Sequence, residues 1–160
     1  MSENFARRVW TDGCFDIFHY GHANLLRMSK LMGQKLVVGI HSDLEISKNK
    51  AYPVMQMSER KYILESIKWV DEVVVNVPYI TDPKTLDYHK CAFCVHGSDD
   101  VFCIDGTDCY EFVKKEERYK SCPRTRCIAS TDIIQRVLFP QAISQPAIKS
   151  SPESAHCFKL

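Results

Sequence analysis

Short apolar runs alternate with longer segments of helical periodicity along most of this chain, and that alternation limits the folds open to it. Residues 9–11, 36–40, 73–75 and 93–95 have the pattern of buried strands. Residues 20–32, 59–68, 82–91, 108–119 and 131–139 have the pattern of helices. Strands that are buried on both faces and joined by helices require a parallel sheet with right-handed crossovers. The sequence therefore predicts an α/β fold in which a parallel sheet carries helices on both faces.

Individual residues mark where several of these helices begin or end. Gly33 follows the first helix and is placed to end it as a C-cap. Ser58 is expected to cap the second helix at its N-terminus. Pro83 stands in the first turn of the third helix, where its missing N–H costs nothing. Asp108 and Glu111 have the spacing of a capping box for the fourth helix.

Length and composition bound the domain organisation and several classes of function. The chain of 160 residues suits one domain, which we assign to residues 1–140, followed by a flexible C-terminal tail at 141–160. The formal net charge of +1 argues against binding nucleic acid through bulk positive charge. No stretch approaches the ~20 apolar residues of a transmembrane helix. The first residues lack the apolar core of a secretory signal, so we expect a cytoplasmic protein.

The eight cysteines are expected to be free thiols, because a chain without a secretory signal folds in a reducing compartment. Cys91 and Cys94 have the C-x-x-C spacing of a zinc site. A second pair of ligands at matching spacing is not evident. We therefore predict no metal site in the protein and treat most of these cysteines as small buried hydrophobic residues.

The turn after the first strand combines glycines, an acid and two histidines. In a parallel α/β sheet, ligands bind beyond the carboxyl ends of the strands, where residues 12–22 (DGCFDIFHYGH) fall. Gly13 permits a tight turn, and Gly21 leaves the backbone open to a phosphate. His19 and His22 share one face at the N-terminus of the next helix, where unpaired N–H groups also attract anions. Taken alone, this histidine spacing is more typical of surface or capping residues than of a ligand site.

Two longer motifs resemble the signatures of the cytidylyltransferase family. The first signature, G-x-F-D-x-x-H-x-G-H, matches residues 13–22. The second, R-T-x-G-x-S-T-[ST]-D-I-[IV]-x-R, is approximated by residues 124–136. Lys50 stands where the family has a phosphate-binding lysine. The resemblance extends over about residues 9–138 and implies a Rossmann-like nucleotidyltransferase fold.

The resemblance also implies which residues bind CTP and act on it. His19, His22, Lys50 and Arg124 are the candidate catalytic residues, which would neutralise charge on the transferring phosphate. The candidate CTP-binding residues are Gly13, Cys14, Phe15, His19, Gly21, His22, Lys50, Asp99, Arg124, Thr125, Ser130 and Thr131. Mg²⁺ bound to the CTP triphosphate is the implied cofactor.

Four stretches resemble the ethanolamine-phosphate branch of the family. They are residues 68–73, 78–81, 95–99 and 105–114. The implied reaction joins CTP to phosphoethanolamine, forms CDP-ethanolamine and pyrophosphate, and belongs to phosphatidylethanolamine biosynthesis. Asp16, Tyr79 and Tyr110 are the candidate residues of the amine-substrate pocket, because a primary ammonium donates hydrogen bonds and needs acceptors. A choline-phosphate enzyme and an adenylyltransferase of the same fold are the alternatives.

The second signature departs from the family pattern at two positions. Cys127 replaces the expected glycine, and Ala129 replaces the expected serine. A non-catalytic relative that binds CTP is therefore a further alternative. If residues 125–127 form a short strand, the alternation of side chains places Cys127 towards the triphosphate and Arg126 away from it. Ala51 also replaces the glycine that usually follows the family's lysine.

The resemblance bears on assembly as well. Members of the ethanolamine-phosphate branch generally carry two such domains in one chain, whereas this sequence holds one. We expect either a homodimer that reproduces the two-domain arrangement or a truncated form of a longer chain. The expected partners are CTP, phosphoethanolamine and a second copy of the chain, with no nucleic acid.

Overall fold

The structure, a computed structural model, describes residues 8–140 and is built on a five-stranded sheet. The strands are β1 (Arg8–Gly13), β2 (Lys35–Ile40), β3 (Glu72–Val75), β4 (Phe93–Gly97) and β5 (Tyr119–Cys122). The helices are α1 (Tyr20–Leu31), α2 (Asp43–Asn49), α3 (Met57–Glu65), α4 (Pro83–Tyr88), α5 (Glu111–Lys115) and α6 (Ser130–Leu138). All strand pairs are parallel, in the order β3-β2-β1-β4-β5, which confirms the predicted fold class.

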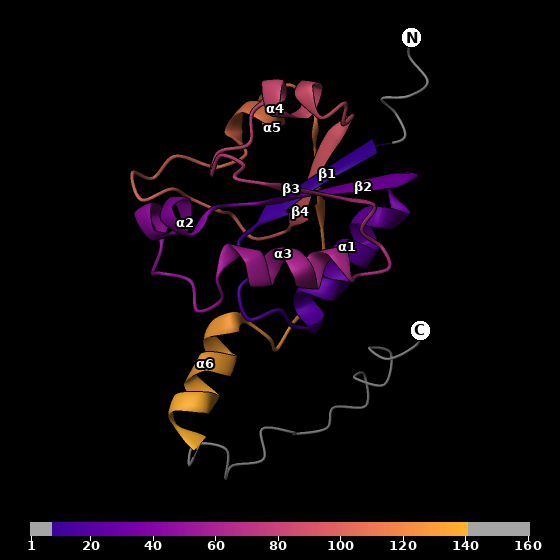
Figure 1. Cartoon of the computed structure of the whole chain (residues 1–160). Helices are drawn as coiled ribbons and strands as arrows, with labels where there is room; N and C mark the ends of the chain where they lie inside the picture. Colours follow the sequence, from indigo (N-terminus) through magenta and orange to yellow (C-terminus); the bar gives the residue numbers. More distant parts are fainter. Residues whose placement is uncertain (1–7, 141–160) are drawn as a thin grey trace, which may run out of the picture. The chain divides into compact units, whose positions relative to one another are not determined.

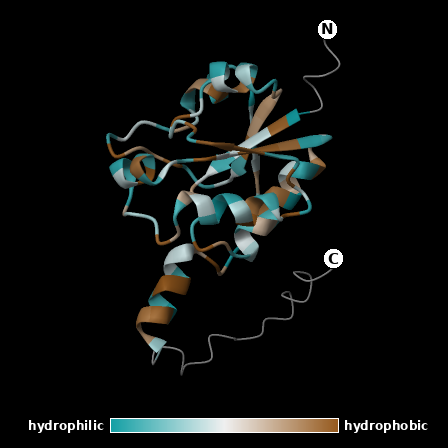
Figure 2. Cartoon of the chain, viewed as in Figure 1, coloured by the Kyte–Doolittle hydropathy of each residue, from teal (hydrophilic) through white to brown (hydrophobic). Residues whose placement is uncertain are grey.

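Helices cover both faces of the sheet. Figure 1 shows α1 and α3 on one face and α4 and α5 on the other. Val9 of β1 lies in one apolar cluster with Leu26 of α1 and Leu64 of α3. The next residue, Trp10, lies in a second cluster with Leu86 of α4 and Val113 of α5. Figure 2 shows the same division, with apolar strands at the centre and mixed colouring on the helices. Burial on both faces explains why β1, β2 and β4 read as continuous apolar runs.

The strand order places a reversal point next to β1. The chain runs from β1 to β2 and β3 on one side, then crosses to β4 and β5 on the other. In open parallel sheets the crevice beyond the carboxyl ends of the strands at this point is the usual ligand site. The turns that follow β1 and β4 therefore frame the candidate site.

Three predicted helix caps are wrong. Helix α5 begins at Glu111 with Tyr110 as its N-cap, so Asp108 and Glu111 do not form the predicted capping box. Helix α1 ends on Met32, which has right-handed backbone angles, so Gly33 is not needed as a left-handed cap. Helix α3 begins earlier than predicted, and its N-cap is Gln56 rather than Ser58. The backbone N–H of Gln56 donates to the Glu59 carboxylate at 2.7 Å, which is one half of a capping box. Pro83 stands in the first turn of α4, as predicted.

Two short elements were not predicted, and three helices end at least three residues earlier than predicted. Helix α3 stops at Glu65 instead of residue 68. In α2, Ile46 is the buried residue, so the segment lacks an apolar stripe. Strand β5 pairs with β4 at the edge of the sheet, where polar Lys120 and Ser121 remain exposed. Residues 116–119 were predicted to be helical, but α5 stops at Lys115 and β5 follows. Helix α4 stops at Tyr88, short of residue 91.

Residues from Thr131 onward form a second unit, which is described by itself. Its described part is α6, where Ile133, Ile134, Val137 and Leu138 recur at helical spacing. The helix predicted at residues 131–139 is thus confirmed to within one residue at each end. The predicted tail, residues 141–160, lies outside the described residues. Among the helices of residues 8–140, none has the length and apolar character needed to span a bilayer.

Candidate functional site

The two histidines of the first turn form a stacked pair at the N-terminus of α1. His19 is the N-cap, and its Nδ1 accepts a hydrogen bond from the Gly21 N–H at 3.1 Å. The Nδ1 of His22 accepts from the His19 N–H at 3.4 Å. The rings stack with centroids 3.9 Å apart and an interplanar angle of 16°. The H-x-G-H spacing therefore serves as a capping box that fixes both rings.

These hydrogen bonds determine which ring nitrogen carries the proton. Because Nδ1 accepts in both rings, the proton of each neutral imidazole lies on Nε2. Burial, together with the neighbouring His19, lowers the pKa of His22 to about 3. His22 is therefore neutral near pH 7 and presents an Nε2–H donor. Two such donors beside the N–H groups of a helix N-terminus are suited to a phosphate.

Gly21 has a steric role in this arrangement. A Cβ at this position would lie 2.9 Å from Cε1 of His19 and 3.0 Å from Cγ2 of Ile128. A side chain here would therefore push the His19 ring out of its stack or displace the loop that carries Ile128. Gly13 differs, because a Cβ there would meet only the Phe15 ring, at ordinary contact distance.

The turn between β1 and α1 holds two residues in the left-handed region. Phe15 has φ 53° and Ile17 has φ 46°. This region costs an L-residue about 1–2 kcal/mol, and a β-branched side chain such as that of Ile17 is rarely found there. The Phe15 ring is buried and meets the His22 ring edge-on at 5.6 Å. Strain of this kind is characteristic of turns that position functional groups.

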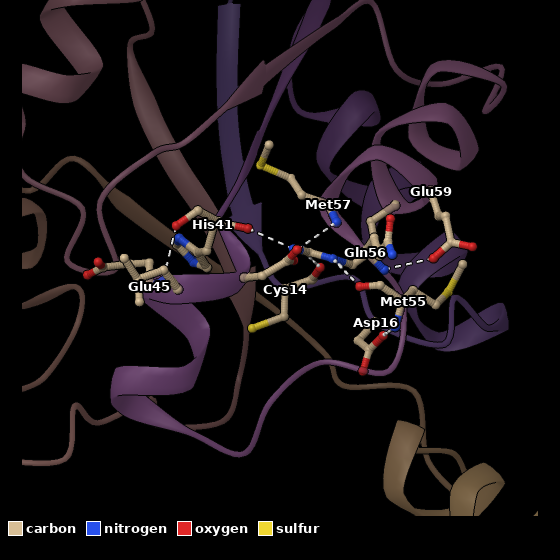
Figure 3. Close-up of polar contacts among 12 residues, drawn as sticks. Cys14, Asp16, His41, Glu45, Met55, Gln56, Met57 and Glu59 are labelled. Atoms are coloured by element: carbon tan, nitrogen blue, oxygen red, sulfur yellow. Dashed lines mark hydrogen bonds and ion pairs between the residues drawn. The ribbon is translucent and has the colours of Figure 1, made fainter.

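A buried arginine fastens the turn to three other segments. Arg60 of α3 is fully buried, and its Nη1 donates to the Cys14 carbonyl at 2.6 Å. Its Nη2 donates to the His41 carbonyl at 3.0 Å and to the Asp43 carboxylate at 2.6 Å. Its Nε donates to the Met55 carbonyl at 3.2 Å. Figure 3 shows Cys14, His41 and Met55, whose carbonyl groups accept these hydrogen bonds. Arg60 thus holds together the ends of β1 and β2, the start of α2 and the loop before α3.

Asp16 binds the backbone of that loop. Its two carboxylate oxygens accept from the N–H groups of Val54 and Met55, both at 2.8 Å (Figure 3). Its carbonyl accepts from the Ser130 hydroxyl at 2.7 Å. Through these contacts, Asp16 holds the loop that follows Lys50 in place. They do not bring it to Tyr79 and Tyr110, with which it was grouped as an amine-pocket residue.

A different carboxylate, that of Asp12, lies beside the pocket aromatics. Asp12 is the second-to-last residue of β1, is 1% exposed and accepts from the Tyr110 hydroxyl at 2.8 Å. It also accepts from the Trp10 indole N–H at 3.0 Å and from the Thr81 hydroxyl. Sequence reasoning missed this residue, although its place at the carboxyl end of β1 was a signal for it. Three neutral donors leave part of the acceptor capacity of a carboxylate unused, because it has about four acceptor positions.

Tyr79 and Lys50 complete this second cluster. The Tyr79 hydroxyl is buried and has no hydrogen-bond partner among residues 8–140. Burial raises the pKa of Tyr79, so the hydroxyl is a neutral donor and acceptor. The Lys50 ammonium lies 6.0 Å from the centre of the Tyr79 ring. Cys14 packs against the same apolar cluster. Burial raises the pKa of its thiol, and the positive charge of Lys50 offsets part of this rise.

The first residues of the second signature, 124–127, lie in a segment beside α1 that includes a turn. Arg124 forms an exposed ion pair with Asp99, and its backbone N–H donates to the Ser98 hydroxyl at 3.4 Å. The Thr125 hydroxyl accepts from the Asn24 side chain at 2.9 Å. Arg124 and Asp99, two of the candidate CTP-binding residues, therefore neutralise each other in this structure. Thr131 belongs to the second unit, so its place relative to this turn is not described.

The prediction of a short strand at residues 125–127 is wrong. Arg126 and Cys127 form a turn, so strand alternation does not decide which side chain faces the nucleotide. Cys127 has φ 64°, a conformation that favours glycine. Its carbonyl accepts from the Tyr20 hydroxyl at 3.4 Å. The cysteine therefore occupies a backbone position for which the family's glycine is the better fit.

Among the described residues, no three His, Cys, Asp or Glu side chains are grouped so that they could hold a metal ion. The Nδ1 atoms of His19 and His22 accept backbone hydrogen bonds, which occupy their lone pairs. Mg²⁺ is commonly bound through substrate phosphates and water with few protein ligands. The residues present therefore fit a magnesium ion that arrives with a triphosphate rather than one held in a protein cage.

Comparison with known proteins agrees with this geometry. The model of a family described as cytidylyltransferase-like matches residues 10–136. The chain belongs to the cytidylyltransferase-like family. The matched range runs from β1 into α6 and so includes both histidines and the Asp12 cluster. A crystal structure of the lipopolysaccharide core biosynthesis protein from Thermoplasma volcanium GSS1 has the same fold, with a TM-score of 0.59 and 25% identity. That likeness covers 77% of this chain and 98% of the other.

Named members of the cytidylyltransferase-like family differ in their similarity to the chain. The ethanolamine-phosphate cytidylyltransferase of Mus musculus is 51% identical over 131 residues, which cover 82% of this chain. Choline-phosphate cytidylyltransferase 2 of Arabidopsis thaliana is 39% identical over a similar share. The chain spans 32% of the mouse relative and 44% of the plant one. It thus corresponds to about a third of the mouse relative's length.

Proposed function

We propose that the chain catalyses cytidylyl transfer from CTP to phosphoethanolamine, which yields CDP-ethanolamine and pyrophosphate. The observation that carries the proposal is the buried Asp12 carboxylate, flanked by Tyr110 and Tyr79, on the same sheet edge as the histidine pair. A carboxylate with spare acceptor capacity and an unpartnered hydroxyl suit the three N–H donors of a primary ammonium. The higher identity to the mouse ethanolamine-phosphate enzyme than to the plant choline-phosphate enzyme supports the same substrate.

The chemistry requires charge stabilisation and needs no protein nucleophile. A phosphate oxygen of phosphoethanolamine attacks the α-phosphorus of CTP, and the bond to the β-phosphate oxygen breaks to release pyrophosphate. In this proposal the Nε2–H groups of His19 and His22 donate to the phosphate oxygens as their charge grows. Lys50 supplies a positive charge from the loop that Asp16 anchors. Arg124 leaves its ion pair with Asp99 and binds a phosphate of CTP. Mg²⁺ would be bound to the triphosphate.

Pyrophosphate release by the purified chain tests the proposal. Release should require CTP, phosphoethanolamine and Mg²⁺ together, and His22→Ala should lower kcat about 100-fold, because the lost donor acts on the transition state. Lys61→Ala, on the exposed side of α3, serves as the control. Asp12→Asn should raise KM for phosphoethanolamine and leave KM for CTP unchanged. CTP binding without any pyrophosphate release would overturn the proposal in favour of a non-catalytic relative.

Direct competition with phosphocholine tests the amine. A quaternary ammonium has no N–H donor and depends on aromatic faces. Phosphoethanolamine should therefore have the higher kcat/KM. Equal or reversed preference would assign the chain to choline phosphate and leave the mechanism intact.

Assembly and location extend the proposal to the whole protein. We propose a cytoplasmic homodimer, in which two copies replace the paired domains expected in longer members of the branch. Sedimentation equilibrium at several concentrations measures the association directly. A single species of monomer mass at all concentrations would contradict the dimer.

A further inference from the structure

We propose that Cys103 and Cys109 form a reversible disulfide that acts on the amine-substrate pocket. Their sulfur atoms lie 3.4 Å apart, at the base of a short loop between β4 and α5. A disulfide has an S–S length of about 2.05 Å, so side-chain rotation has to bring the two atoms closer by about 1.4 Å.

The backbone around the pair is a small hairpin that keeps the two cysteines together. Phe102 and Asp108 form an isolated antiparallel bridge. The Cys103 N–H donates to the Thr107 carbonyl at 2.8 Å, and the Cys109 N–H donates to the Val101 carbonyl at 2.9 Å. These hydrogen bonds flank the two sulfur atoms on either side. Closure of the disulfide therefore does not require the loop to refold.

The two thiols differ in a way that sets the order of reaction. Cys103 is half-buried, whereas Cys109 is 1% exposed. Burial, together with the hydrogen bond to Cys103, raises the pKa of Cys109 to about 12. Cys103 is therefore the more accessible thiol and meets a dissolved oxidant first. Cys109 is the partner that resolves the intermediate.

The oxidant is a low-molecular-weight disulfide of the glutathione type. The Cys103 thiolate attacks one sulfur of the oxidant, whose S–S bond breaks, and one glutathione leaves as a thiolate that takes up a proton. Cys109 then loses its proton and attacks the Cys103 sulfur of the mixed disulfide, which expels the second glutathione. The two cysteine thiols lose two electrons and two protons, and the oxidised glutathione is reduced to two thiols.

The link to the pocket runs through the residue next to Cys109. The Tyr110 hydroxyl donates to Asp12 at 2.8 Å, and the Cys109 carbonyl accepts from the Thr81 N–H at 2.9 Å. Thr81 is itself a donor to Asp12. Movement of Cys109 towards Cys103 therefore acts on two of the three donors that surround the Asp12 carboxylate.

Peptide mapping of the unmodified chain tests the bond itself. A protease that cuts before aspartate, combined with trypsin, leaves Cys103 in residues 100–104 and Cys109 in residues 108–114. After incubation with oxidised glutathione, these two peptides should be covalently linked, and dithiothreitol should separate them. Separate peptides after oxidation, or Cys103 linked to another cysteine such as Cys14, would overturn the proposal.

A matched pair of variants tests the order of reaction. Cys109→Ser should stop at the mixed disulfide, with glutathione on Cys103. Cys103→Ser should leave the buried Cys109 unmodified. The reverse pattern would overturn the assignment of Cys103 as the attacking thiol. If Cys109→Ser fails to fold, Cys103→Ser together with the mapping of the unmodified chain still decides the question.

A kinetic comparison tests the link to the pocket, and this arm alone rests on the proposed function. Oxidation should raise KM for phosphoethanolamine by about 5-fold or more, the lower range of coupling between two sites, and leave KM for CTP unchanged. Cys103→Ser should be insensitive to oxidation. A linked peptide with an unchanged KM would overturn the action on the pocket. An inactive chain that still forms the linked peptide would contradict the proposed function and not the disulfide.

Discussion

At the scale of single residues, His22 is a histidine that the fold keeps uncharged. Burial is the larger cause of its low pKa, and the stacked His19 ring adds to it. A neutral ring is suited to donate through Nε2 while its Nδ1 holds the His19 backbone. The pKa of His22 is lowered in the folded protein and not in the unfolded chain, so the unfolded chain binds a proton more readily. The unfolding free energy therefore depends on pH.

The unfolding free energy should fall as the pH is lowered from about 6.5 to 3. The folded pKa of His22 lies near 3 and the unfolded value near 6.5, so in this window the unfolded chain binds the extra proton. His22→Asn keeps an acceptor for the His19 N–H and cannot titrate. The unfolding free energy of His22→Asn should therefore fall less steeply than that of the unmodified chain. The two slopes should differ by up to about 1.4 kcal/mol per pH unit. Denaturant titrations of both proteins at several pH values measure this, and parallel curves would contradict it.

Replacing the strained cysteine of the second signature should stabilise the chain. Cys127 has φ 64°, and Cys127→Gly removes the contact between Cβ and backbone that makes this conformation costly. We expect a gain of about 1 kcal/mol in unfolding free energy, since the relief is partly offset by the greater freedom of glycine in the unfolded chain. Cys127→Ala keeps the Cβ and is the matched control. An equal gain in both variants would show that the thiol, not the backbone, is the cause.

The double variant Cys127→Gly, Ala129→Ser restores the family pattern. It tests how much the altered signature weakens the interaction with CTP. One recovered hydrogen bond to a charged group is worth about 1.5–3 kcal/mol, so kcat/KM for CTP should rise about 10- to 100-fold. Arg126→Ala should change little. No gain in the double variant, combined with a large loss in Arg126→Ala, would mean that this turn depends on Arg126.

The histidine motif indicated a polar turn after β1, and the structure brings the two rings together. The choice between Asp12 and Asp16 could not be made from sequence, because both flank the same glycine-containing turn. Only the tertiary contacts of Thr81 and Tyr110, far along the chain, distinguish the two carboxylates. The missing glycine of the second signature indicated that Cys127 occupies a position suited to glycine. The turn that contains Cys127 was not predicted from the sequence.

At the scale of secondary-structure elements, α3 carries the residue that joins most of the site. Arg60 contacts the turn after β1, the end of β2, the start of α2 and the loop before α3. Its charge is paired with Asp43, and its other described partners are carbonyl groups. One side chain thus contacts all four segments, so a displacement of one segment affects the position of the others.

Arg60→Lys should lower the unfolding free energy by about 3–5 kcal/mol, because one ammonium cannot reach four acceptors and buried polar groups are left unpaired. Lys61→Ala on the same helix is the matched control and should cost at most about 1 kcal/mol, since its ion pair with Glu65 is exposed. Thermal unfolding followed by circular dichroism measures both. Equal losses would show that α3 is sensitive to any substitution.

The elements missed by sequence analysis share a physical reason. Helix α2 buries Ile46 and no other residue, and β5 exposes its polar residues Lys120 and Ser121. Periodicity of apolar residues reports burial, so elements with little burial leave a weak pattern. The central strands β1, β2 and β4 were predicted because both of their faces are covered.

At the scale of the whole molecule, residues distant in sequence meet at one edge of the sheet. Asp12 lies near the end of β1, Thr81 follows β3, and Tyr110 precedes α5. A ligand that binds these groups in the folded state and not in the unfolded chain stabilises the entire domain. Binding should therefore be visible as a global rise in the unfolding temperature.

CTP should stabilise the chain more than ATP, GTP or UTP do. At a concentration 100 times its Kd, a ligand specific for the folded state adds about 2.7 kcal/mol. A panel of the four nucleotides with Mg²⁺, followed by differential scanning calorimetry, measures the preference. A larger shift with ATP would favour the adenylyltransferase alternative, and equal shifts would argue against a base-specific site.

The hydrogen bond from Trp10 to Asp12 gives the molecule an intrinsic optical reporter. The chain has two tryptophans, and Trp10 is fully buried with its indole N–H on the carboxylate proposed to receive the ammonium group. Charge placed near an indole shifts its emission, so filling the amine pocket alters the fluorescence of Trp10 without an added label. In a Trp69→Phe background, that emission follows the arrival and departure of the amine substrate in real time, separately from the binding of the nucleotide.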